Sequence, residues 1–143
     1  MSEPEAGQPG MGQPDTGRPI WIEDDLVLAI HDRQLAEHGG AEGLRSESLL
    51  RSALGRPQNH FAYASTDLVD LAAKYTAGIV QNHPFVDGNK RTGFVVGVLF
   101  LELNGYRFTA SEPDAAQAVL ELAAGTIDEV GFLDFLRANV DRA

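Results

Sequence analysis

Apolar residues recur at three- and four-residue steps along most of this chain, which is the period of amphipathic helices. The clearest stretch covers residues 66–82, with Thr66 as the expected N-cap. Its stripe consists of Leu68, Leu71, Ala72, Tyr75, Ile79 and Val80. A second stretch follows Gly88, is apolar nearly all round and ends at Asn104-Gly105, a C-terminal stop signal. A helix of that kind is expected at the middle of a small bundle.

Four further helices are predicted from the same periodicity and from capping residues. They cover about residues 23–37, 46–54 behind an N-cap at Ser46, 111–125 with Pro113 in the first turn, and 126–140. Thr126 and Glu129 are expected to cap the last helix, whose apolar face would be Val130, Phe132, Leu133, Phe135, Leu136 and Val140. Residues 106–109 are expected to form a short extended connector. The predicted fold class is therefore all-α, a compact bundle of about six helices around one buried helix.

Two stretches do not fit the helical pattern. Residues 1–19 contain four prolines and four glycines and have little apolar content, so we expect a disordered lead before a single domain at residues 20–143. Residues 55–63 combine glycine, proline and amides with two aromatic side chains, and a short irregular flap is expected there. Its residues are Arg56, Pro57, Gln58, Asn59, His60, Phe61 and Tyr63.

Composition narrows the class of protein. A chain of 143 residues is large enough to bury a core as one domain. It has no cysteine and no apolar segment typical of a signal peptide or a membrane span, so we expect a cytoplasmic protein that does not contact the membrane. Its net charge of −10 disfavours direct nucleic-acid binding, and the few cations are therefore informative where they cluster.

The candidate chemistry lies in the ten residues that precede and begin the apolar helix, His-Pro-Phe-Val-Asp-Gly-Asn-Lys-Arg-Thr at positions 83–92. A helix N-terminus presents unpaired N–H groups and partial positive charge, which favours phosphate. Gly88 allows close approach of the backbone, and three residues add donors and positive charge: Asn89, Lys90 and Arg91. We predict a nucleotide and phosphate site at Gly88, Asn89, Lys90, Arg91 and Thr92.

Two other side chains complete the predicted site. Asp87 is placed to hold Mg²⁺, which is commonly bound by one or two carboxylates together with substrate phosphates. His83 is the expected base for a hydroxyl group near neutral pH. The predicted catalytic residues are His83, Asp87, Lys90 and Arg91, with ATP and Mg²⁺ as ligands.

Taken together, these residues resemble the signature His-x-Phe-x-Asp/Glu-Gly-Asn-x-Arg of the Fic/Doc superfamily. The matching positions are His83, Phe85, Asp87, Gly88, Asn89 and Arg91. The resemblance covers roughly residues 20–140. Fic nucleotidyltransferases usually have glycine after the asparagine and a second arginine three residues beyond the first, whereas this chain has Lys90 and Phe94. At those two positions the chain resembles the Doc (death-on-curing) branch.

The Doc resemblance implies transfer of the γ-phosphoryl group of ATP to a Ser or Thr hydroxyl of a protein, with elongation factor Tu as the implied target and arrested translation as the result. It also implies that residues 56–63 dock the target beside the active site, and a plain packed loop is the alternative for this stretch. AMP transfer remains the alternative reaction, because Gly88 stands where some Doc proteins have alanine. The Ser/Thr-x-x-x-Glu pattern of a self-inhibiting helix is missing from the lead, so the resemblance implies inhibition by a separate Phd-type antitoxin.

Two readings of a different class stay open. One is a catalytically inactive binding module. The other is a metal hydrolase built on His31, His60 and His83, which is disfavoured because these histidines do not show a helical ligand spacing. His31 and His38 are otherwise expected to be surface or structural residues.

Overall fold

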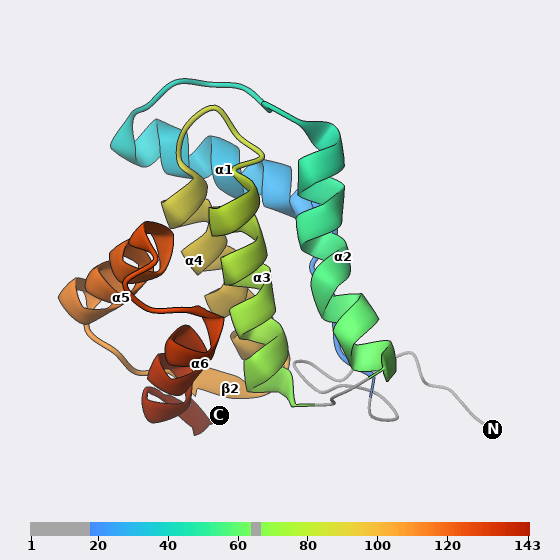
Figure 1. Ribbon diagram of the computed structural model, residues 1–143, viewed down its shortest axis with the longest axis vertical. Helices are drawn as coiled ribbons and strands as arrows, with labels where there is room; N and C mark the ends of the chain where they lie inside the picture. The colour runs from blue at the N-terminus through green and yellow to red at the C-terminus, as the bar shows by residue number, and fades with distance from the viewer. Residues whose placement is uncertain (1–17, 64–66) are drawn as a thin grey trace.

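The computed structural model describes residues 18–63 and 67–143, and within these ranges it is a helical bundle with one small sheet (Figure 1). The elements in chain order are α1 (Asp24–His38), α2 (Glu47–Tyr63), α3 (Leu68–Asn82), α4 (Asn89–Leu103), β2 (Tyr106–Phe108), α5 (Glu112–Ala124), α6 (Glu129–Ala138) and β3 (Val140–Arg142). The prediction of an all-α bundle of six helices is confirmed for these residues. The expected disordered lead falls largely on residues 1–17, outside the described ranges.

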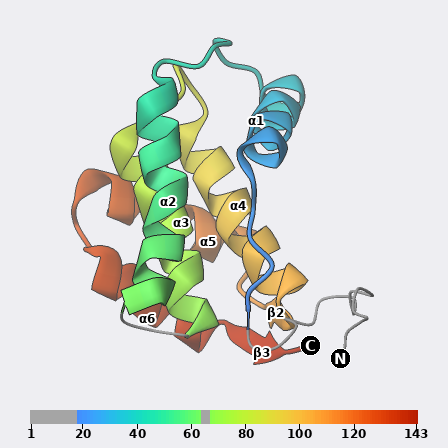
Figure 2. The ribbon, with the colours of Figure 1, turned by 90° about the vertical axis from the view of Figure 1, so that its right-hand side faces the viewer.

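Helix α4 lies at the centre of the bundle, as predicted. Figures 1 and 2 show it enclosed between α3, α1 and α5. Two glycines let α3 approach it closely: a Cβ at Gly93 would lie 3.1 Å from Val80 Cγ2, and a Cβ at Gly97 would collide with the hydroxyl of Thr76. That hydroxyl donates to Gly93 O at 2.8 Å. The close packing fixes the α3–α4 pair, and therefore the loop that joins them.

Helix α3 is the most continuously buried helix and ends at the candidate site. Its N-cap is Asp67, whose carboxylate accepts hydrogen bonds from the backbone N–H groups of Val69 and Asp70. The expected cap at Thr66 lies outside the described residues. Its C-cap is His83, where the backbone turns into the left-handed region.

Helix α2 corrects the prediction of an irregular flap. Instead of ending near Leu54, it continues to Tyr63 with Pro57 inside it. An internal proline removes a helical hydrogen bond and costs about 3 kcal/mol or more. Here Pro57 is buried, and Phe61 packs edge-on against Trp21 with ring centroids 5.6 Å apart. Burial of apolar surface along this helix offsets the cost of the proline, which local sequence signals alone do not register.

The second half of α2 also lies far from the α3–α4 loop. His60 Nε2 is 3.1 Å from a carboxylate oxygen of Asp70, near the start of α3, whereas His83 ends that helix. At 1.5 Å per residue, Asp70 and His83 are roughly 20 Å apart along the helix axis. Figure 2 shows the end of α2 and the loop after α3 toward opposite ends of the bundle. The prediction that residues 56–63 flank the active site is therefore wrong.

The C-terminal part closes the bundle with a two-stranded antiparallel sheet in which Tyr106 pairs with Arg142 and Phe108 with Val140. The extended connector at residues 106–109 is confirmed as a strand, but its partner β3 takes residues that the periodicity assigned to the last helix. Helix α5 begins as predicted, with Ser111 accepting from the N–H of Asp114.

The predicted capping box of the last helix is wrong. Asp128 is the N-cap of α6 and accepts from Gly131 N, whereas Glu129 forms ion pairs with Lys74 and Arg56. Val130, assigned to the apolar face, is 64% exposed. Over residues 18–63 and 67–143, no helix is long and apolar enough to span a bilayer.

Candidate active site

The loop between α3 and α4, residues 83–88, is built around the buried ring of Phe85. The carboxamide of Asn89 accepts from Phe85 N and donates to Phe85 O, both at 2.9 Å. The imidazole of His31 stacks on the Phe85 ring with centroids 3.7 Å apart, and its Nε2 is 2.8 Å from Asp87 O. Two side chains from α1 and α4 therefore hold the loop in one shape, and His31 is a structural residue.

His83 stands at the start of this loop with its side chain exposed. Its backbone has φ 57° and ψ 53°, and it is the one non-glycine residue with positive φ among the described residues. Among residues 18–63 and 67–143 its imidazole has no hydrogen-bond partner, so both ring nitrogens are open to a bound molecule. Such a side chain at a strained backbone position is typical of functional sites.

Asp87 presents an exposed carboxylate to the same region. One oxygen accepts from Gly88 N at 2.8 Å and the other accepts from Ala41 N at 3.2 Å. The hydrogen bonds from Ala41 and Gly88, followed by the charges of Lys90 and Arg91, lower the pKa of Asp87 below its ordinary 3.8. The carboxylate is therefore ionised at neutral pH and still has free lone pairs.

The N-terminus of α4 faces this carboxylate without a side-chain cap. Gly88, the N-cap, has φ 81°, in the left-handed region that glycine adopts without steric cost. The helix contains no acidic residue in its first turn, and the exposed side chains of Lys90 and Arg91 form no ion pair with any described residue. Open backbone N–H groups, the helix dipole and two cations without an ion-pair partner among the described residues make this end a candidate anion site.

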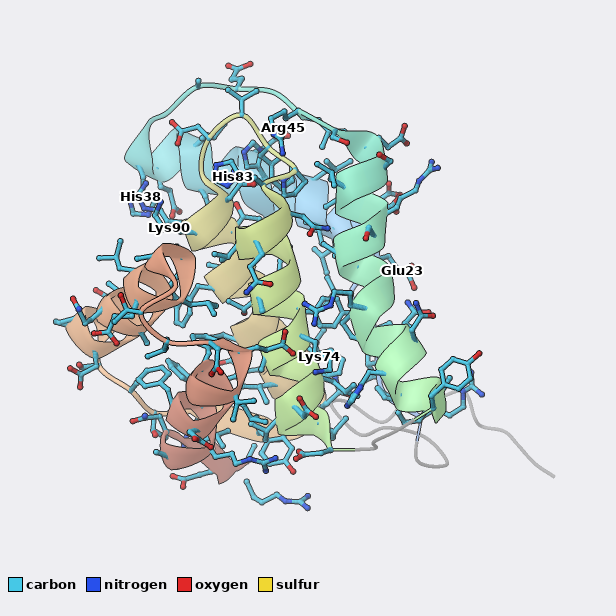
Figure 3. The ribbon with its side chains drawn as sticks, in the orientation of Figure 1. Glu23, His38, Arg45, Lys74, His83 and Lys90 are labelled. Atoms are coloured by element: carbon cyan, nitrogen blue, oxygen red, sulfur yellow. The ribbon has the colours of Figure 1, made fainter. Side chains whose placement is uncertain are left out.

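A groove of about 670 Å³ extends from this anion site between α4 and α5. Asp87, Gly88, Asn89, Lys90 and Arg91 line its polar end, together with Gln34 and His38 of α1. Its remaining wall is mainly apolar and contains Phe94, Val95, Val98, Phe108, Ala115, Val119 and Leu120. Figure 3 shows His38, His83 and Lys90 at the same end of the molecule. The groove is therefore a candidate ligand site with charged residues at one end and mainly apolar residues along the rest.

The structure brings together most, but not all, of the predicted residues. Asp87, Gly88, Lys90 and Arg91 line the polar end of the groove, whereas His83 begins the same loop but is not among the residues that line the groove. The Asn89 carboxamide is occupied by Phe85, so only its backbone N–H faces the anion site. Thr92 is fully buried, does not line the groove, and its hydroxyl has no partner among the described residues. The phosphate contact predicted for its side chain therefore does not fit this geometry.

Sequence reasoning missed the segment that borders the site, residues 39–46, which we call the strap. It runs between α1 and α2 and lies along the 83–88 loop (Figures 1 and 2). Val86 N donates to Gly43 O, Leu44 forms a bridge with Phe85, and Arg45 N donates to Pro84 O. The glycines at 39, 40 and 43 indicate a loop, but no local pattern indicates what that loop contacts.

The histidine metal site is not formed. His31 contacts the loop backbone, His60 contacts Asp70 near the far end of α3, and no cluster of three His, Cys, Asp or Glu side chains that could hold a metal is present in residues 18–63 and 67–143.

Comparison with known proteins agrees with this geometry. A family model described as "Fic/DOC family" matches residues 21–101, more than half of the chain. The chain belongs to the Fic/DOC family. It is 32% identical over 117 residues to "Protein kinase doc" of Escherichia phage P1, an alignment that covers 81% of this chain and 92% of the relative. It is 35% identical over 89 residues to "Toxin Doc" of Mycolicibacterium smegmatis, covering 60% of this chain and 68% of that relative. These relatives place the chain in the Doc branch.

Proposed function

We propose that this Doc-branch protein is a toxin that transfers the γ-phosphoryl group of ATP to a Ser or Thr hydroxyl of a protein. The observation that carries the proposal is the pairing of a free imidazole, His83, with a helix N-terminus whose two cations have no partner in the described part of the chain. His83 would serve as the proton acceptor, and the helix N-terminus would serve as the phosphate site. The printed names of the two relatives, a kinase and a toxin, support the same reading.

ATP would occupy the groove with its phosphates at the polar end. Backbone N–H groups of the first turn of α4 would donate to phosphate oxygens, and Arg91 would bind two oxygens through its planar guanidinium. The apolar wall near Phe94 and Phe108 would cover the adenine ring. The volume of about 670 Å³ lies within the range usual for sites of small ligands.

Asp87 fits the role of a magnesium ligand. Its carboxylate is exposed and ionised, and each oxygen has accepted only one hydrogen bond. A single carboxylate is enough for Mg²⁺ that arrives with a nucleotide, because the phosphates and water supply the other ligands. Bound there, Mg²⁺ would neutralise part of the phosphate charge.

In the reaction, His83 would accept the proton of the target hydroxyl while the hydroxyl oxygen forms a bond to the γ-phosphorus of ATP. The bond from that phosphorus to the bridging oxygen breaks, and ADP leaves with the electron pair. Lys90, Arg91 and the helix end would stabilise the charge on the phosphoryl oxygens. Positioning and electrostatics supply most of the acceleration in reactions of this class.

Transfer from ATP labelled in turn at the γ and α phosphates tests the reaction. Elongation factor Tu is the first target to use, and His83→Ala is the inactive control. We expect label to reach the target from γ-labelled ATP only. Label arriving from α-labelled ATP only would reject the kinase and establish AMP transfer.

We further propose that the toxin is inhibited by a Phd-type antitoxin encoded separately. Induced expression of the chain alone should arrest growth, and co-expression of the antitoxin should restore it. Harmless expression of a folded chain, with no transfer from either labelled ATP, would instead support an inactive binding module.

A further inference from the structure

The backbone of His83 is held in a conformation that non-glycine residues rarely adopt. It lies in the left-handed region at the C-cap of α3, with its N–H bonded to Ile79 O at 3.1 Å. A left-handed residue with a Cβ is strained, and it persists only where its surroundings impose it. Because the imidazole forms no hydrogen bond with any described residue, its direction depends on this backbone.

Arg45 of the strap forms hydrogen bonds to the backbone of this turn. Its Nε donates to His83 O at 2.7 Å and its Nη2 donates to Asn82 O at 3.0 Å. Its own N–H donates to Pro84 O at 2.7 Å. One residue therefore binds three successive carbonyl groups, and Figure 3 shows Arg45 and His83 side by side at the turn after α3.

The chemistry of arginine suits this task. The last carbonyl groups of a helix lack partners within the helix and carry partial negative charge, so a cation is favourable there. The guanidinium holds its donors in a rigid plane, so two bonds to neighbouring carbonyls fix the orientation of both peptide groups. A lysine ammonium could reach the same carbonyls, but it imposes no such plane.

The strap also reaches the other functional side chain of the loop. Ala41 N donates to the Asp87 carboxylate, and Gly40 passes so close that a Cβ there would lie 2.8 Å from Asp87 Oδ2. The same segment thus contacts the loop beside both His83 and Asp87.

We propose that Arg45 is a positioning residue that holds His83 in its left-handed conformation and thereby aims the imidazole. Its effect on the reaction rate rests on the function proposed above. Its effect on the backbone of His83 does not.

The test compares Arg45→Ala and Arg45→Lys with Arg51→Ala. Arg51 is a matched control, because it is also exposed and its partner Glu47 lies within α2. NMR backbone chemical shifts of His83, which report its φ, should move away from left-handed values in Arg45→Ala and stay unchanged in Arg51→Ala. In the labelled-ATP assay, kcat of Arg45→Ala should fall roughly tenfold to hundredfold with little change in KM for ATP. Arg45→Lys should recover part of that loss.

Wild-type shifts of His83 in the Arg45→Ala variant would overturn the proposal. So would a loss confined to KM, or one that follows only the fraction of folded protein. A wild-type chain that transfers no phosphoryl group would refute the proposed function, and the chemical shifts would still decide whether Arg45 holds His83.

Discussion

Two clusters of charged side chains lie toward opposite ends of α3 and differ in how their charges are satisfied. In the first, Lys74 Nζ contacts Glu129 at 2.6 Å and Asp70 at 3.4 Å, Arg56 contacts Glu129 at 2.7 Å, and His60 contacts Asp70 at 3.1 Å. All five side chains are partly buried. This cluster joins α2, α3 and α6, and we call it the structural cluster.

The second cluster surrounds the N-terminus of α4. Lys90 and Arg91 are exposed and form no ion pair within the described residues, and Asp87 accepts only backbone N–H groups. Figure 3 shows Lys74 on the lower part of α3, whereas Lys90, His38 and His83 lie at the other end. Charges neutralised inside the chain hold its helices together, and charges left open are available to a ligand. This difference makes the N-terminus of α4 the candidate ligand site, independently of any relative.

Substitutions of His83 and of His60, which lie toward opposite ends of α3, should differ most in their effect on the rate of phosphoryl transfer. His83→Ala should reduce phosphoryl transfer by roughly a hundred- to ten-thousandfold, because it removes the proposed base. It should leave folding intact, because the imidazole forms no hydrogen bond with any described residue. His60→Ala should leave the rate near wild type, because His60 contacts only Asp70 in the structural cluster. Equal losses of rate in both variants would contradict the assignment of the two ends.

A pair of lysine substitutions should separate binding from stability. Lys90→Ala should weaken ATP binding by roughly tenfold to hundredfold, since it removes a charged donor to phosphate, and should leave the free energy of unfolding nearly unchanged. Lys74→Ala should lower the free energy of unfolding by about 1–3 kcal/mol, because Glu129 and Asp70 lose a half-buried partner, and should leave ATP affinity unchanged. Calorimetric titration and urea denaturation measure the two quantities. Lower stability in Lys90→Ala together with weaker ATP binding in Lys74→Ala would contradict the assignment of one cluster to ligand binding and the other to stability.

Two neighbouring glycines of the strap offer a finer test. Both have positive φ, but a Cβ at Gly39 would meet no atom within 4 Å, whereas one at Gly40 would meet Asp87 Oδ2 at 2.8 Å and Leu35 at 3.0 Å. Gly40→Ala should therefore displace the Ala41 hydrogen bond to Asp87 and weaken binding of Mg²⁺·ATP roughly three- to tenfold relative to Gly39→Ala. Indistinguishable affinities of the two variants would show that the strap does not support Asp87.

The smallest expected effect is on the free energy of unfolding at acidic pH. Although burial raises the pKa of Glu129, hydrogen bonds and charge from Lys74 and Arg56 outweigh it and hold that pKa below its ordinary 4.5. The resulting stabilisation is complete above about pH 4.5 and is lost as the pH falls through the lowered pKa. Glu129→Gln should therefore lower stability at neutral pH and make it less dependent on pH below 4.5. If urea denaturation shows the same dependence of the free energy of unfolding on acidic pH in Glu129→Gln as in the wild type, the stabilising role of Glu129 in the structural cluster is contradicted.

The helices could be predicted where their signals are local. Ser111 with Pro113, Gly125 after α5, and Gly88 before the apolar helix mark element ends that the structure confirms. Helix α2 was predicted too short because proline and glycine are penalised locally, whereas the burial of Pro57 and Phe61 depends on Trp21 and α3. The partner of β2 was missed for a similar reason, since the register of β3 depends on a contact between distant segments.

The candidate site, too, could be predicted only where its residues are close together in the sequence. The residues of the candidate loop and of the first turn of α4 lie within ten consecutive positions, so the sequence alone could point to them. Arg45 and His83 are separated by 38 positions, and no periodicity connects them. The sequence predicts a phosphate contact for Asn89, because composition does not reveal that the backbone of Phe85 already occupies its carboxamide. Contacts between distant segments decide which polar groups remain free.

The proposed function depends on the open charges at the N-terminus of α4 binding the phosphates of ATP. The most direct measurement is an NMR titration of the folded chain with Mg²⁺·ATP, following the backbone amides of Asn89, Lys90 and Arg91 against those of Asp70, Lys74 and Glu129. We expect saturable shifts in the first group and none in the second. Shifts confined to the second group, or no shifts at saturating nucleotide, would contradict the proposed function.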